Sequence, residues 1–251
     1  MQTQKKLNCS GALLLGAAAV VSTPAAAYEA GDILFRTGAV VVAPDESSDG
    51  IAIPALGVPP IEGTGVEIDN DTQLTLMATY MFSDSLGIEL LAATPFTHNI
   101  TADLRAAGYG KVPVGEATHL PPTLSAVWYP LGSASALSPY VGIGVNYTVF
   151  IDEDVSSALE GAVPIVANDI AGIDLGESVP LSMDLDSSVG IAFQLGVDYN
   201  LNDKWHVNAS ARWIDIETDA KITNRDLGTV ITVDNVKIDP WVYQLNIGYR
   251  F

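Results

Sequence analysis

The sequence has a single cysteine, Cys9, few basic residues and no long hydrophobic run beyond its N-terminal region. A lone cysteine excludes an internal disulfide framework. Residues 28–251 contain no stretch of 18 apolar residues, so we expect no transmembrane helix. Only 11 Lys and Arg accompany 30 Asp and Glu, and the formal charge of −19 disfavours nucleic acid as a partner.

The first 27 residues have the three parts of a secretory signal peptide. Lys5 and Lys6 give a positive start, residues 13–21 are apolar, and Ala25-Ala26-Ala27 is a small-residue cleavage site. We expect residues 1–27 to be removed near Ala27 and residues 28–251 to form one secreted domain. Lipid attachment at Cys9 is not expected, because the apolar segment follows this cysteine instead of preceding it. Removal of the two lysines changes the formal charge from −19 to −21.

Apolar residues are abundant but occur in short alternating runs, and the mean hydropathy is +0.28. The clearest run is the C-terminal segment 241–251, in which one face is aromatic and aliphatic while the other contains Gln244, Asn246 and Arg250. The apolar face consists of Trp241, Tyr243, Leu245, Ile247, Tyr249 and Phe251. Aromatic residues at both ends of an aliphatic centre are typical of a strand that faces lipid.

The same alternation upstream predicts eight strands, over residues 31–43, 71–82, 86–97, 118–130, 138–151, 184–199, 204–218 and 237–251. The connectors alternate between short turns, at 83–85, 132–136 and 200–203, and long loops, at 44–70, 98–117, 152–183 and 219–236. This layout predicts an all-β, eight-stranded antiparallel transmembrane β-barrel with short periplasmic turns and long extracellular loops. A soluble β-sandwich would explain neither the aromatic bands nor the signal peptide.

Five segments resemble the outer membrane protein W family, which includes alkane-import proteins, and they run in the family's order. They are ELLAATPF (Glu89–Phe96), HLPPTLSAVWYP (His119–Pro130), PYVGIGVNYTVF (Pro139–Phe150), GVDY (Gly196–Tyr199) and DPWVYQLNIGYRF (Asp239–Phe251). The resemblance implies a monomeric barrel of the Gram-negative outer membrane whose hydrophobic lumen passes small apolar molecules. A last strand that ends on Phe251 also resembles the recognition signal of the barrel-assembly machinery.

Inward-facing charges are expected near the periplasmic end of the bore. Eight strands leave a bore that side chains fill, so buried charges there should pair. We predict a charged plug made of Arg36, Glu89, Asp198 and Arg250, with His206 at the same level. The alternative is that these residues only stabilise the barrel and have no role in gating.

Above this level the inward positions become apolar, apart from Arg212. The predicted hydrophobic lumen consists of Val40, Met77, Leu91, Ala93, Val127, Phe150 and Ile214. Pro95 in the third strand and Pro121 and Pro122 in the fourth cannot donate hydrogen bonds to a neighbouring strand. They predict either a lateral opening in the barrel wall or a bulge that only tapers the barrel.

The loops and histidines add less specific hints. Residues 51–61 and 162–173 are apolar and could fold inward as a funnel, or the second could form a short helix. The acidic interval 152–183 is either a solvated face or a site for divalent cations near lipopolysaccharide, and it names no metal ligands. His98 and His119 could meet at the rim, but no motif ties a serine to either, so we expect no catalytic site and no cofactor.

These observations predict a passive outer-membrane channel for small hydrophobic molecules with lateral release into the membrane. The expected partners are outer-membrane lipid and lipopolysaccharide, the barrel-assembly machinery and a small apolar cargo. The alternative is a non-transporting structural or surface-interaction barrel that serves envelope integrity, adhesion, or phage or toxin reception. A pore for water-soluble solutes is a third reading.

Overall fold

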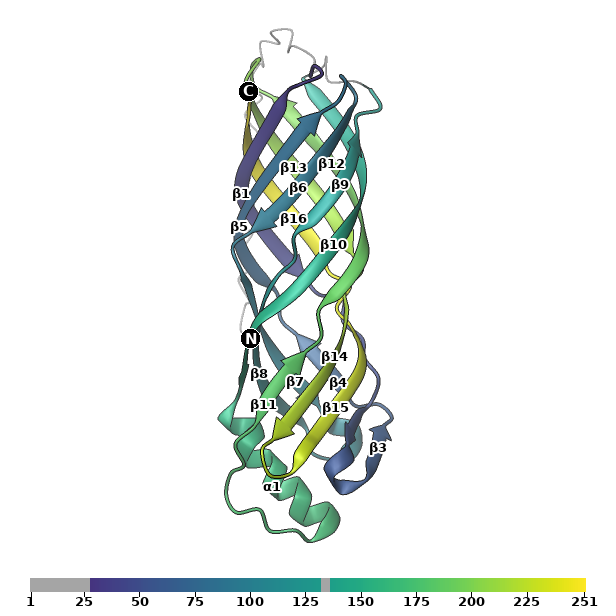
Figure 1. Cartoon of the computed structure of the whole chain (residues 1–251), viewed down its shortest axis with the longest axis vertical. Helices are drawn as coiled ribbons and strands as arrows, with labels where there is room; N and C mark the ends of the chain where they lie inside the picture. The colour runs from purple at the N-terminus through teal and green to yellow at the C-terminus, as the bar shows by residue number, and fades with distance from the viewer. Residues whose placement is uncertain (1–27, 132–135) are drawn as a thin grey trace, which may run out of the picture.

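The computed structural model describes residues 28–131 and 136–251. The predicted signal peptide and most of the predicted turn at 132–136 lie outside these ranges. Eight strands form one half of an elongated molecule (Figure 1). These barrel strands are β1 (Ile33–Ala43), β5 (Asp71–Met81), β6 (Leu86–Ala93), β9 (Thr123–Trp128), β10 (Leu137–Val155), β12 (Ser188–Asn200), β13 (Trp205–Ile214) and β16 (Trp241–Arg250).

The eight strands close into a barrel because every one of them pairs with two neighbours. The antiparallel order runs β1, β5, β6, β9, β10, β12, β13 and β16, and β16 pairs back to β1 over ten residues. Closure leaves no free edge in the barrel, which suits a lipid environment without backbone hydrogen-bonding partners. The predicted fold is therefore confirmed.

The two faces of each strand follow the predicted alternation. In β16, Leu245 and Ile247 are exposed on the outside while Gln244 and Asn246 are buried inside. Two aromatic bands mark the ends of this apolar surface. At the end with the short turns, Trp205, Tyr249 and Phe251 pack edge to face; at the other end, Trp241 packs on Tyr243 and Trp213 on Phe193.

The strands continue beyond the barrel as a second, non-membrane part that we call the extension, in the lower half of Figure 1. One side of it is built by β4 (Gly65–Ile68), β7 (Phe96–Asp103) and β8 (Lys111–Leu120), which pairs with the end of β10. The other side is built by β2 (Ile51–Ile53), β3 (Val58–Ile61), β11 (Ser182–Leu185), β14 (Glu217–Asn224) and β15 (Gly228–Lys237). Of the four segments expected to be long loops, 98–117 and 219–236 are largely strand, 44–70 contains three short strands, and 152–183 is mainly a helix with irregular chain. Together they surround an apolar core that includes Ile51, Val114, Val163 and Val233.

Short helices close the far end of the extension. The 3-10 turns η1 (Pro54–Leu56) and η2 (Arg105–Ala107) accompany one α-helix, α1 (Ser157–Ala171). The Ser156 side chain caps α1 by accepting a hydrogen bond from Leu159 N at 3.2 Å, and Gly172 ends it at φ 67°. Residues 162–171 of the apolar segment 162–173 therefore lie in a helix, as one of its two readings predicted. Within the described ranges no helix is long and apolar enough to cross a membrane.

At the junction between barrel and extension, the strands break. The predicted strands 86–97 and 118–130 are each divided, at Thr94-Pro95 and at Pro121-Pro122. Those at 184–199, 204–218 and 237–251 also contain a break and continue into separate strands of the extension. Only β10, with 19 residues, runs unbroken through the junction among the described strands, and it carries an irregularity between Phe150 and Asp152.

Candidate functional site: the lumen and its wall

A network of buried charges crosses the bore in the half of the barrel that carries the short turns. Arg36 Nη1 lies 3.0 Å from Glu89 Oε2, and Arg36 Nη2 lies 2.8 Å from Asp198 Oδ2. Its remaining N–H groups donate to Thr79 Oγ1 at 2.9 Å, Tyr129 OH at 2.9 Å and His206 Nε2 at 3.1 Å. The five N–H groups of this guanidinium therefore all have acceptors.

The second arginine of the network is Arg212, which the sequence placed higher in the lumen. Its Nη2 lies 2.8 Å from Glu89 Oε1, so Glu89 binds one arginine through each carboxylate oxygen. Arg250, which was assigned to the plug, lies instead at the end of the barrel, where its Nε is 2.8 Å from Asp32 Oδ2. Two arginines and two carboxylates remain in the bore, so the network is balanced in charge.

A layer of aromatic and apolar side chains fills the bore below the network, toward the short turns. Its fully or nearly fully buried members are Tyr28, Leu34, Met81, Val127, Tyr129 and Tyr140. Gly196 makes room for the Tyr140 ring, because a Cβ atom there would lie 2.4 Å from Tyr140 Cζ. Val127, expected in the upper lumen, belongs to this layer because it is the penultimate residue of β9. Together the layer and the network close this end of the lumen.

The middle of the lumen, above the network, is polar rather than apolar. Ser210 donates to Gln244 at 2.9 Å, and Asn146 Nδ2 lies 3.0 Å from Thr123 Oγ1. Of the predicted lumen residues, Val40, Ala93, Phe150 and Ile214 meet in one apolar cluster near the junction, packed with Phe96, Val42 and Ile216. Met77 and Leu91 are buried outside this cluster, and Met77 Sδ lies 3.7 Å from Asn246 Nδ2.

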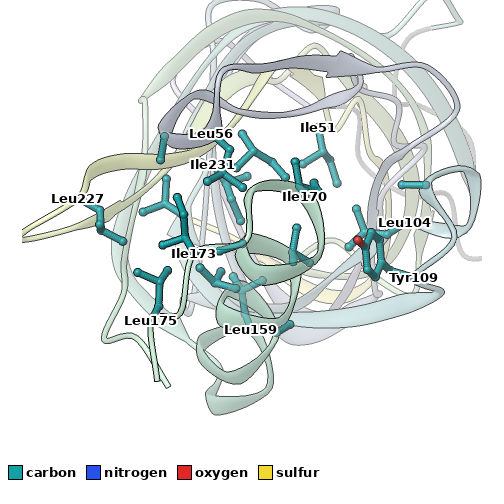
Figure 2. Close-up of a pocket in the computed structure, with 18 of the residues that line it drawn as sticks. Ile51, Leu56, Leu104, Tyr109, Leu159, Ile170, Ile173, Leu175, Leu227 and Ile231 are labelled. Carbon is teal, nitrogen blue, oxygen red and sulfur yellow. The ribbon is translucent and has the colours of Figure 1, made fainter. Parts of the chain in front are cut away.

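Apolar side chains also line a cavity of about 360 Å³ at the far tip of the extension. Figure 2 shows Ile51 and Leu56, Leu159 and Ile170 of α1, Leu227 and Ile231 near the β14–β15 turn, and Leu104 and Tyr109 between β7 and β8 around it. The apolar segments 51–61 and 162–173 both contribute, as the funnel hypothesis requires. The sequence did not predict that residues 104–109 and 227–231 line the cavity, because each is a short apolar stretch without the periodicity of a helix or a strand.

The wall of the barrel is interrupted where the prolines lie. Pairing of β6 with β9 ends at Leu91 and Thr123, and the continuing strands β7 and β8 pair only from Phe96 and His119 onward. The interruption is on the side predicted from Pro95, Pro121 and Pro122. The carbonyls of Pro121 and Pro122 are not left free, since Asn146 Nδ2 donates to them from the neighbouring strand at 3.1 and 3.2 Å.

Comparisons with known proteins agree with this architecture. Residues 29–251 match the OmpW family. Outer membrane protein W of Escherichia coli (strain K12) is 40% identical over 248 residues, which cover 98% of this chain and 100% of that protein. Outer membrane protein AlkL of Ectopseudomonas oleovorans is 28% identical over 186 residues, which cover 74% of this chain and 69% of that protein.

The crystal structure of the outer membrane protein OprG from Pseudomonas aeruginosa has the same fold, with a TM-score of 0.75 and 38% sequence identity. The alignment covers 90% of this chain and 98% of that one. A family match over nearly the whole chain, relatives of equal length and a shared closed barrel lead to one assignment. The chain belongs to the OmpW family and is a β-barrel protein of the Gram-negative outer membrane.

Proposed function

We propose that the protein is a passive channel that admits small hydrophobic molecules at its extracellular tip and releases them sideways into the membrane. The observation that carries this proposal is the apolar tip cavity of about 360 Å³, which lies in line with apolar side chains that end beside the interrupted wall. An apolar solute gains about 0.8 kcal/mol for each methylene it buries, so such a lining attracts it from water.

The path from tip to wall is continuous in apolar residues. Leu159 and Val163 line the tip cavity and belong to the core of the extension. Phe150 packs against that core and also against the cluster near the junction, which contains Val40 and Phe96. A molecule moving along this path would meet mostly apolar side chains until it reaches the level of Pro95.

Below that level the bore is unsuitable for an apolar cargo. The polar middle of the lumen, the Arg36–Glu89–Asp198–Arg212 network and the aromatic layer would each have to be crossed. Separating buried charges to make a passage is costly. The interruption between Leu91–Thr123 and Phe96–His119 avoids this cost, since it lies at the lower end of the apolar path.

Cross-linking the interruption tests the exit. Extended beyond its last pair, Leu91 and Thr123, the register of β6 with β9 places Thr94 opposite Leu120, so the pair Thr94→Cys/Leu120→Cys would lock the wall by a disulfide. The matched control is Ala78→Cys/Leu90→Cys, which joins lipid-facing partners inside the continuous β5–β6 ladder. Uptake of a medium-chain alkane by cells is measured with each pair oxidised and reduced, and folded protein at the surface is quantified by heat-dependent gel mobility.

We expect slow uptake for the oxidised Thr94–Leu120 pair, recovery on reduction, and no change for the control pair. Normal uptake through the locked wall would mean that the prolines form only a taper and that the exit lies elsewhere. If wild-type cells take up no more alkane than cells without the protein, the non-transporting reading, a structural or surface-interaction barrel, is the better one.

The same proposal includes the partners of the chain. The lipid-facing bands require contact with outer-membrane lipid, and the charged extension would meet lipopolysaccharide. The last strand, ending on Phe251, would be read by the barrel-assembly machinery during insertion. A closed barrel without a free edge supports a monomer.

A further inference from the structure

Two histidines stack on each other inside the extension, directly above the interrupted wall. The rings of His98 on β7 and His119 on β8 have centroids 5.1 Å apart and planes inclined by 20°. Both side chains are buried, with 4% of each residue exposed. Phe96 and Phe150 pack around the pair, with centroids 5.6 and 5.8 Å from that of His119.

These two rings line a small cavity on the apolar path between the tip and the junction. The cavity measures about 40 Å³. Its other lining residues are mostly aliphatic, and they include Val66, Ile68, Ile100 and Val236. Among the described residues that line it, the imidazole nitrogens are therefore unusual polar atoms in a hydrophobic passage.

The hydrogen bonds of the pair leave polar atoms unused. His98 Nδ1 lies 2.6 Å from the backbone oxygen of Asp69, which only accepts, so Nδ1 carries the hydrogen. In the neutral ring, Nε2 of His98 is then an acceptor. This Nε2 and Nδ1 of His119 are buried without a partner in the part of the chain that the structure describes. Burial among apolar groups lowers the pKa of His119 and so favours the neutral form of that ring.

A neutral imidazole has one donor and one acceptor, so Nε2 of His98 is a free acceptor, and Nδ1 of His119 is a free donor in the tautomer that carries its hydrogen on Nδ1. The hydroxyl group of a cargo molecule meets both, because it donates one hydrogen bond and accepts another. An alkane meets neither, and a ketone or ester carbonyl only accepts. A carboxylate also only accepts, and it would be repelled by the Asp69 carboxylate, whose Oδ1 is 4.0 Å from His98 Nδ1.

We propose that His98 and His119 bind the hydroxyl group of a cargo alcohol whose hydrocarbon chain lies along the apolar path. The inference rests on the proposed channel function and adds a substrate class to it, since the channel would prefer an alkanol to the alkane of equal length. The hydroxyl donates to His98 Nε2 and accepts from the N–H of His119, and the alkyl chain stays among the aliphatic lining.

The chain allows a direct binding test because His98, His119 and His206 are its only histidines. The full protein, labelled with ¹⁵N in its histidine rings and held in lipid nanodiscs, would be titrated with 1-octanol and separately with n-octane. We expect 1-octanol to move the ring resonances of His98 and His119, and n-octane to leave them in place. His206, which is bonded to Arg36 in the charge network, is the internal control and should not move with either probe.

Uptake experiments separate this inference from the channel proposal. His98→Phe keeps an aromatic ring in the stack but removes the acceptor, and the loss of one hydrogen bond should lower 1-octanol uptake about fivefold with n-octane uptake unchanged. Resonances that ignore 1-octanol, or that respond equally to both probes, would overturn the alcohol site even if octane crosses the membrane. Octanol binding without uptake of either probe would instead overturn the channel and leave the site standing.

Discussion

Arg36 and Glu89 form an ion pair across the barrel in which neither side chain is exposed to solvent, with 3.0 Å between Nη1 and Oε2. Glu89 also holds Arg212 through its other oxygen. Asp198 supplies the other negative charge of the network through Arg36, so removal of Glu89 leaves Arg212 without an ion-pair partner among the described residues. This dependence makes Glu89 the most informative position of the network.

Glu89→Ala should lower the free energy of unfolding by about 3–5 kcal/mol, because it leaves buried positive charge without compensation. Urea unfolding followed by tryptophan fluorescence measures the effect. The matched control is Glu67→Ala, which removes an exposed ion pair with Lys111 in the extension and should have little effect. An unchanged unfolding midpoint for Glu89→Ala would mean that water or another cation partner reaches the network.

The protein should also conduct ions poorly in planar bilayers. The charge network and the layer of Tyr28, Tyr129 and Tyr140 below it fill the bore, and an eight-stranded barrel has little width to spare. The double variant Arg36→Gly/Glu89→Gly removes two large side chains of opposite charge and leaves the net charge of the network unchanged, so its conductance should exceed that of the wild type. Stable porin-like currents from the unaltered protein would contradict a closed bore.

The sequence predicted the barrel well because lipid and lumen impose a strict two-residue period on each membrane strand. That period placed Arg36, Glu89 and Asp198 inside, where the structure has them. It did not predict their heights. Strands in a barrel are tilted and staggered, so positions equally far from a turn lie at different levels on different strands. Arg212 therefore reaches down to Glu89, and Val127 lies below the network.

The extension could not be read in the same way. In β15 the buried residues Val230, Val233 and Val236 are three residues apart, not two. The pairing of β14 with β15 shifts register between Thr218 and Ala220 and again between Ile222 and Thr223. Each shift moves the following side chains to the other face, which removes the alternation that marks a strand. Without that alternation, these segments were predicted to be loops.

The final prediction concerns the tip cavity, where α1 offers two isoleucines with different surroundings. Ile170 lines the cavity, whereas Ile165 is exposed and is not among its lining residues. Ile170→Asp should reduce alkane uptake, because a carboxylate binds water and brings it into the cavity. An apolar solute then loses about 0.8 kcal/mol for each methylene group that contacts water instead of the apolar lining. Ile165→Asp should leave uptake unchanged.

Both substitutions lie in the extension, away from the barrel ladders, so folded protein measured by heat-dependent gel mobility should be equal to that of the wild type. Uptake is then compared at equal surface level. If Ile165→Asp slows uptake as much as Ile170→Asp does, added negative charge near the membrane surface is the cause and not the cavity. If neither variant slows uptake while the locked Thr94–Leu120 pair does, cargo joins the apolar path below the tip, and the cavity is not the entrance.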